Sequence, residues 1–200
     1  SVVLLGGFVF NRGIDAERVA LRQHQVADQA VDQLDRAMTR ADEALQGIGS
    51  FHSSSQFVSA DELRVFTAQA LVHNPSLQAL SWNPVVRADE LAAFEERQRA
   101  QPGMASFRVT EKDASGQLVP VSARPEYVVV AYIEPRSANH AALGFDIASN
   151  PVRAAAVEAA RDTGELASTA PLELVQETGA QKGILLLQPV YEGGSLPPSE

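Results

Sequence analysis

Apolar residues recur along the first quarter of the chain at steps of four and three, which predicts a long helix with one narrow apolar seam. No proline or glycine interrupts residues 16–46, and we expect the helix to extend over residues 14–50. The seam consists of Leu34, Met38, Ala41, Leu45 and Ile48. So narrow a stripe suits a stalk helix that either pairs with a second stalk or leans along the edge of a domain.

Three shorter helices are predicted after the stalk. Ser59 and Glu62 form a capping box before an amphipathic stretch at residues 60–73, which an Asn-Pro pair ends. A second amphipathic stretch covers residues 88–99. An asparagine N-cap, a proline at the first helical position and a following glycine predict the third helix at residues 151–162.

Strands are predicted where β-branched and aromatic residues gather between turn residues. The segment EYVVVAYIE, residues 126–134, is too apolar to face water and predicts a central strand. Two hairpins are expected, one around residues 113–116 and one around residues 177–183, and a further strand at residues 77–82. This order predicts an α+β fold, an antiparallel sheet with flanking helices that cover one side of it.

Alternation along the central strand predicts two faces, because successive side chains of a strand point in opposite directions. One face carries Tyr127, Val129, Ala131 and Ile133, and the other carries Val128, Val130, Tyr132 and Glu134. Tyr132 and Glu134 would then offer a phenol and a carboxylate to one ligand. The alternative is that Tyr132 belongs to the core and that Glu134 faces solvent at the strand end.

Composition narrows the functional classes. The 200 residues include 16 basic and 25 acidic ones, a net charge of −9, and no basic stripe alternates with aromatic residues. We therefore expect no nucleic-acid partner. The absence of cysteine excludes disulfides and cysteine-based zinc sites. The histidines lie far apart, and no phosphate-binding loop or nucleophile elbow occurs, so we expect no enzyme, no metal and no cofactor.

Several segments together resemble the CHASE domain of bacterial and plant sensor proteins. They match in order and spacing over roughly residues 60–191, and LGFDIASNP followed by ARDTG and PVY is the most specific part of the pattern. The other segments are LQALSWNPVV, FEERQRA, YVVVAYIEP and GILLLQPVYE. The resemblance implies an extracytoplasmic ligand-sensing module with a stalk helix and a PAS-like domain, between two transmembrane helices that lead to a histidine kinase or a diguanylate cyclase.

The resemblance also implies a domain plan. The uncharged start SVVLLGGFVF is too short to span a bilayer, which needs ~20 apolar residues, so we expect residues 1–13 to be the C-terminal part of a transmembrane helix. A buried N-terminal strand or helix is the alternative. The stalk, the membrane-distal PAS-like sensor domain over residues 51–191 and a linker over residues 192–200 would follow. A membrane-proximal part would lie beyond Glu200, and the domain would face the periplasm at a bacterial inner membrane.

Six residues are the expected ligand contacts, namely Tyr132, Glu134, Tyr127, Thr169, Leu186 and Asn139. Plant members of the family use an aspartate at the end of the corresponding strand to bind an adenine-type ligand, and Pro135 takes that place here, with Glu134 beside it. Thr169 falls where the family offers a small hydroxyl, although it equally suits a β-branched strand residue. Asn139 lies in the loop at residues 136–140, where we expect ligand specificity to differ between relatives.

The expected partners are a small-molecule ligand, an adenine-like compound being one candidate, and a second copy that forms a homodimer through the stalk helix. The alternative function is a dimerisation or scaffold module without a small-molecule ligand. One structural ion pair is also expected. Arg153 lies in the first turn of its helix, where the helix dipole disfavours a cation, and it should pair with Asp146.

Overall fold

The computed structural model describes residues 32, 36, 38–47, 60–75, 77–173 and 182–191. Contacts divide the chain into two compact units, residues 1–40 and 41–200. In the predicted stalk, residues 32, 36 and 38–47 are helical, and the rest of it lies outside the described residues, as do residues 1–13 and 192–200. No helix within the described ranges is long and apolar enough to cross a membrane.

The helices of the second unit begin and end close to the predicted positions. They are α2 (Ala60–His73), η1 (Ala88–Glu90) with α3 (Leu91–Arg99), α4 (Arg136–Asn139), η2 (His140–Ala142), η3 (Ile147–Ser149) and α5 (Pro151–Thr163). The Asn150 side chain accepts hydrogen bonds from the N–H groups of Val152 and Arg153, and Gly164 ends α5 with φ 75°. Of the capping residues, Ser59 lies outside the described residues and Glu62 lies in the first turn of α2. The loop expected at residues 136–140 is instead helical, which corrects that prediction.

Within the described ranges ten short strands form five antiparallel pairs. These are β1 (Leu80–Trp82) with β6 (Tyr132–Glu134), β2 (Val85–Arg87) with β5 (Glu126–Val128), β3 (Thr110–Lys112) with β4 (Leu118–Pro120), β7 (Ala167–Ser168) with β10 (Leu186–Leu187), and β8 (Leu172–Glu173) with β9 (Lys182–Gly183). Both predicted hairpins are therefore present, and the mixed α+β class is confirmed.

The predicted central strand is interrupted by a bulge. Leu80 lies opposite Glu134, and Val85 lies opposite Val128, so residues 83–84 face the three residues 129–131. Pro84 has no N–H to donate, but its carbonyl still accepts from Val129 N–H at 3.1 Å. On the other edge Val130 N–H donates to the Phe145 carbonyl at 3.0 Å. The segment is central, as predicted, but the prediction of one unbroken strand is wrong.

The bulge changes which side chains share a face. Tyr127 and Val129 belong to one buried apolar cluster, whereas Val128, Val130 and Ile133 belong to another. The simple alternation placed Ile133 with Tyr127, and that placement is wrong because an extra residue reverses the alternation beyond the bulge.

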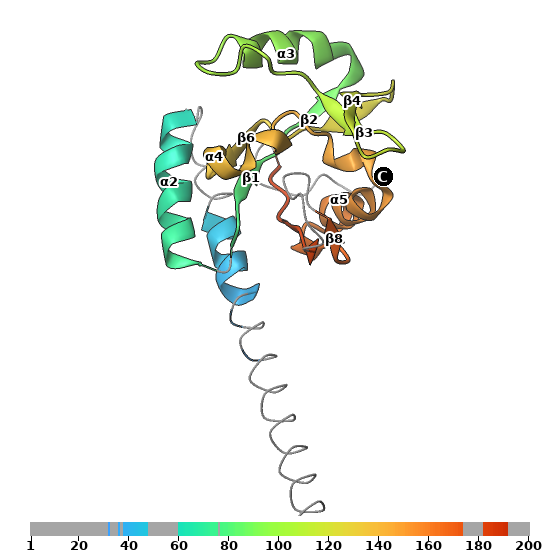
Figure 1. The fold of residues 1–200 in the computed structure, drawn as a ribbon. Helices are drawn as coiled ribbons and strands as arrows, with labels where there is room; N and C mark the ends of the chain where they lie inside the picture. The colour runs from blue at the N-terminus through green and yellow to red at the C-terminus, as the bar shows by residue number, and fades with distance from the viewer. Residues whose placement is uncertain are drawn as a thin grey trace, which may run out of the picture. The chain divides into compact units, whose positions relative to one another are not determined.

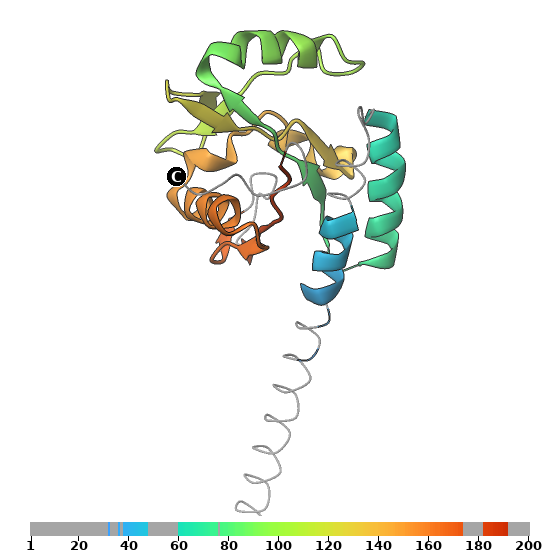
Figure 2. The same cartoon turned by 180° about the vertical axis from the view of Figure 1, so that it is seen from behind.

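Helices cover both faces of the central segment, which corrects the expectation that they cover only one. Phe94 of α3 lies in the cluster with Tyr127 and contacts Phe107 edge to face, with ring centroids 5.9 Å apart. Val157 of α5 packs against the cluster that contains Val128. Figures 1 and 2 show α3 on one side of the strands and α5 on the other. The predicted site thus lies on a strand with a packed core on both faces.

The described end of the stalk lies against its own domain. Ala41 is only 2% exposed. A Cβ added at Gly47 would lie 3.2 Å from the ring of Phe66 on α2, so the two helices touch there. Residues 41–47 therefore pack against α2, as in the predicted alternative in which the helix leans along the edge of the domain. Seam residues Leu34 and Ile48 lie outside the described residues.

Candidate functional site

Tyr132 and Glu134 form a polar cluster at the end of the central segment. Both belong to β6, and the phenol of Tyr132 donates a hydrogen bond to Glu134 Oε1 at 3.1 Å. The other carboxylate oxygen accepts the backbone N–H of Arg136 at 2.9 Å. The prediction that Tyr132 and Glu134 share a face is confirmed. Both side chains are half-buried, so neither is a simple core residue nor a freely solvated one.

Among the described residues the carboxylate of Glu134 forms no ion pair, although the positive charge of Arg64 acts on the neighbouring Tyr132 and lowers its pKa. The contacts of Glu134 are the phenol and the N–H group already named. The nearby guanidinium of Arg136 turns away and donates to the carbonyl of Gly103 at 2.7 Å. A half-buried carboxylate that forms no ion pair interacts strongly with a cation or a strong N–H donor of a ligand.

Helix α2 contributes to the same cluster. Burial raises the pKa of Tyr132 to about 12, a hydrogen bond with Thr67 lowers it, and the negative charge of Glu134 raises it. The phenol is therefore protonated at neutral pH and acts as a donor to Glu134. Thr67 is 2% exposed, and its hydroxyl donates to the carbonyl of Arg64. Thr67 was missed from sequence, although a polar residue four positions from both Leu63 and Leu71 is the signal that could have identified it.

Asn139 supplies an unused acceptor near this strand end. It is fully buried, and its Nδ2 donates to the carbonyl of Pro135 at 2.9 Å. Its Oδ1 has no hydrogen-bond partner. Pro135, whose carbonyl this amide contacts, directly follows Glu134 in sequence, and Asn139 lies at the end of α4. A buried amide oxygen without a donor costs about 1–3 kcal/mol, and a ligand N–H or a water molecule would recover that cost.

Tyr127 lies in a different polar network. It is 3% exposed within an apolar cluster, and its hydroxyl donates to the carbonyl of Ser122 and accepts from the N–H of Arg124, both at 3.3 Å. The guanidinium of Arg124 lies 5.7 Å from the ring centroid. The structure does not bring Tyr127 together with Tyr132 and Glu134, because the phenol is already used by its own neighbours.

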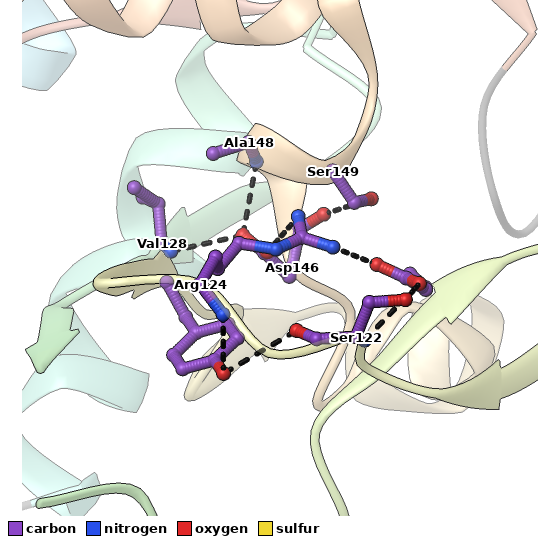
Figure 3. Close-up of polar contacts among 8 residues, drawn as sticks. Ser122, Arg124, Val128, Asp146, Ala148 and Ser149 are labelled. Carbon is purple, nitrogen blue, oxygen red and sulfur yellow. Dashed lines mark hydrogen bonds and ion pairs between the residues drawn. The ribbon is translucent and has the colours of Figure 1, made fainter. Parts of the chain in front are cut away.

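Asp146 is the centre of this second network, which we call the Asp146 clasp and define as Asp146, Arg124 and Glu111 (Figure 3). One oxygen of the Asp146 carboxyl accepts the N–H groups of Val128 at 2.9 Å and Ala148 at 3.0 Å. The other accepts from Arg124 at 2.9 Å, and Arg124 also binds Glu111. Burial raises the pKa of Asp146, although the Val128 hydrogen bond and the charge of Arg124 oppose that shift.

The clasp corrects the predicted Asp146–Arg153 ion pair. Arg124, from the segment before β5, is the ion-pair partner of Asp146. The buried guanidinium of Arg153 lies 5.0 Å from the ring centroid of Phe145 in a cation–π contact. Arg153 points toward the aromatic ring next to Asp146, whereas Arg124 reaches the carboxylate from 22 residues away in sequence. Helix-dipole reasoning cannot reveal such a distant partner.

Thr169 and Leu186 lie together on the β7–β10 pair. Thr169 is 5% exposed, its hydroxyl accepts the N–H of Leu185 at 3.0 Å, and its own N–H donates to the Leu185 carbonyl at 3.0 Å. Leu186 is half-buried opposite Ser168. The Thr169 hydroxyl thus contacts the residue just before β10, and the role of Thr169 and Leu186 as ligand contacts stays a prediction.

The Tyr132–Glu134–Asn139 group, which we call the β6–α4 site, is the candidate binding site. It offers a carboxylate without an ion pair and an amide oxygen without a donor among the described residues, and both features select a ligand with N–H groups or a positive charge. No set of three histidine, cysteine, aspartate or glutamate side chains could hold a metal ion within the described ranges.

Comparison with known proteins gives one family. The model of the CHASE domain matches residues 56–200, most of the chain, and this range contains every labelled helix and strand from α2 to β10 but not the helical residues 38–47. No curated protein matches the chain. The match begins five residues after the predicted domain start at residue 51 and extends through the segment expected to be a linker.

Proposed function

The chain belongs to the CHASE domain family, and from this premise we propose that it binds a small molecule as the periplasmic sensor module of a membrane-bound histidine kinase or diguanylate cyclase. CHASE domains are extracytoplasmic sensor domains of signalling proteins, and the chain is such a sensor module. The ligand, the membrane anchor at residues 1–13 and the output enzyme belong to the proposal.

The β6–α4 site carries the binding proposal. Glu134 is half-buried and forms no ion pair within the described residues, and Asn139 Oδ1 is buried without a donor. A ligand that presents N–H groups would satisfy the half-buried Glu134 carboxylate, and a donor that reached the buried Asn139 Oδ1 would satisfy that oxygen. An amino-substituted heterocycle such as an adenine-type compound has donors of this kind, and Tyr132 would support Glu134 by its phenolic hydrogen bond.

Signal transfer would use the strands that lead to the end of the described chain. Strand β10 is held by β7 through Thr169 and Leu185, and Tyr191 just beyond it donates to the carbonyl of Arg161 at the end of α5. A shift of the central segment against α5 would therefore reach residue 191 directly. A homodimer formed through the stalk would carry the displacement toward the membrane.

Thermal unfolding with and without ligands tests this function. We expect adenine-type and other N–H-rich compounds to raise the melting temperature of the chain. Glu134→Gln should lower the affinity for such a compound by about tenfold, since a charge-assisted hydrogen bond contributes about 1.5–3 kcal/mol. The matched control is Glu165→Gln, which changes the same chemistry at an exposed position after α5. Stabilisation that persists undiminished in Glu134→Gln contradicts the site.

The dimerisation or scaffold module is the second candidate function. It is favoured by the close packing of the chain's own apolar side chains on both faces of residues 126–134. If this alternative holds, no compound in a broad metabolite collection shifts the melting temperature of the folded protein, and the isolated chain dimerises without any ligand. A ligand-dependent shift that Glu134→Gln removes excludes it.

A further inference from the structure

A depression beside α3 has a charge opposite to that of the chain. It has a volume of ≈ 410 Å³ and is lined by Glu95, Arg99 and residues 105–108. The chain as a whole carries a net charge of −9, yet the two arginines and one glutamate of the lining leave one positive charge in excess. That volume lies within the ~300–1,000 Å³ usual for small-molecule sites.

The acceptors of this lining are already used. Glu95 accepts the N–H of Val109 at 2.8 Å with one oxygen and Arg99 at 3.1 Å with the other. Arg99 also donates to the carbonyl of Phe107 at 3.2 Å, which fixes its guanidinium at the rim. Glu95 is therefore neutralised in place and leaves no carboxylate oxygen to attract a cation.

The donors of the lining are mostly unused. The guanidinium of Arg108 and the hydroxyl of Ser106 have no hydrogen bond or ion pair to any other described residue. Both face the same depression, two residues apart on the segment that follows α3. Excess donors, one excess positive charge and no unpaired carboxylate are the chemistry that recognises an oxyanion, because a planar guanidinium binds two oxygens of a carboxylate or phosphate at once.

We propose that the depression between α3 and residues 105–108 is a second ligand site that binds a small molecule through a carboxylate or phosphate group. Arg108 provides the charge and the paired donors, and Ser106 adds a hydroxyl donor. Arg99, held by Glu95, adds positive potential from α3. This site differs from the β6–α4 site in the sign of its charge and does not depend on it.

Thermal unfolding in inorganic phosphate, in acetate and in chloride at equal ionic strength tests the second site. At ten times the dissociation constant, phosphate or acetate should raise the melting temperature by roughly 4 °C more than chloride does. Stabilisation by phosphate alone assigns the phosphate class, and stabilisation by acetate alone assigns the carboxylate class. Equal melting temperatures in all three salts overturn the proposal.

Three variants locate the effect. Arg108→Gln should lower the affinity for the anion by at least about tenfold, since it removes a charge-assisted pair of hydrogen bonds. Arg97→Gln removes an equal charge from an exposed position of α3 outside the lining and should leave the affinity within about twofold. Glu95→Gln should raise the affinity for the anion several-fold, because it removes the only negative charge of the lining. Undiminished anion binding in Arg108→Gln contradicts the site. Glu134→Gln, which lies in the β6–α4 site, should leave the affinity for the anion unchanged.

Discussion

The Asp146 clasp and the β6–α4 site are both built around a carboxylate, but they differ in how fully the oxygens are used. Asp146 is fully buried and receives two backbone N–H groups and a guanidinium. Glu134 is half-buried and receives one phenol and one N–H group, and it forms no ion pair with another described residue. A carboxylate whose oxygens all have hydrogen-bond partners holds strands together, whereas a carboxylate with fewer partners remains available to a ligand.

The difference is visible in what each network joins. The clasp connects the β3–β4 hairpin, the end of β5 and the entry to α5, since it binds Glu111, the N–H of Val128 and the N–H of Ala148. The β6–α4 site joins only β6 to the first residues of α4 and to α2. We therefore expect changes in the clasp to affect folding, and changes in the β6–α4 site to affect binding with little effect on folding.

The largest effect is expected for Asp146→Ala. It leaves the N–H groups of Val128 and Ala148 and the guanidinium of Arg124 without their acceptor, so the free energy of unfolding should fall by about 3–5 kcal/mol. Urea denaturation measures it. The control is Asp162→Ala, whose ion pair with Arg161 is exposed and should contribute less than about 1 kcal/mol. Equal losses in the two variants would contradict the structural role of the clasp.

The next effect is expected for Gly144→Ala, two residues before Asp146. Gly144 has φ +80°, and an added Cβ would lie 2.1 Å from the carbonyl oxygen of Arg108, so the strand carrying Asp146 would be displaced from β3. We expect the free energy of unfolding to fall by about 3 kcal/mol. Gly116→Ala is the matched control, because Gly116 has φ +83° with open space around it and should lose only about 1 kcal/mol. Equal urea midpoints for the two variants would show that the close approach does not matter.

Local signals in the sequence predicted the helices well, because caps act within a few residues. The end of α2 at His73 follows from Asn74-Pro75, and the limits of α5 follow from Asn150-Pro151 and Gly164. These features fix a helix end whatever the rest of the fold does. The shared face of Tyr132 and Glu134 was likewise predictable, since residues two apart on one strand point the same way.

Features that depend on a distant partner could not be predicted from one sequence. The position of Ile133 depends on Pro84, about 50 residues earlier, because the bulge arises where the two segments pair. The partner of Asp146 is Arg124 on a separate segment, and dipole reasoning about α5 favoured Arg153 instead. The lack of a donor to Asn139 Oδ1 depends on how α4 packs in the fold, and no local signal in the sequence indicates it.

The pH dependence of stability tests the contribution of Glu111 to the Asp146 clasp. Hydrogen bonds from Ser122, followed by the charge of Arg124, lower the pKa of Glu111 despite its partial burial. A lowered pKa in the folded state means that Glu111 stabilises the fold above its ordinary value of 4.5 and that this stabilisation is lost as pH falls through the folded-state pKa. Wild type should therefore exceed Glu111→Gln in stability at pH 6, and the gap should narrow toward pH 3. A gap that is constant across this range contradicts the lowered pKa.

The smallest effect is expected for Tyr132→Phe. This change removes one hydrogen bond to a half-buried carboxylate and leaves the ring in place, so the free energy of unfolding should fall by only about 0.5–1 kcal/mol. The same variant should weaken an N–H-rich ligand, because Glu134 loses the donor that orients it. Urea denaturation and ligand-dependent melting on one sample separate the two effects. A stability loss as large as that of Asp146→Ala would mean that β6 is held by its polar cluster as β5 is, and that an unsaturated carboxylate is no guide to a binding site here.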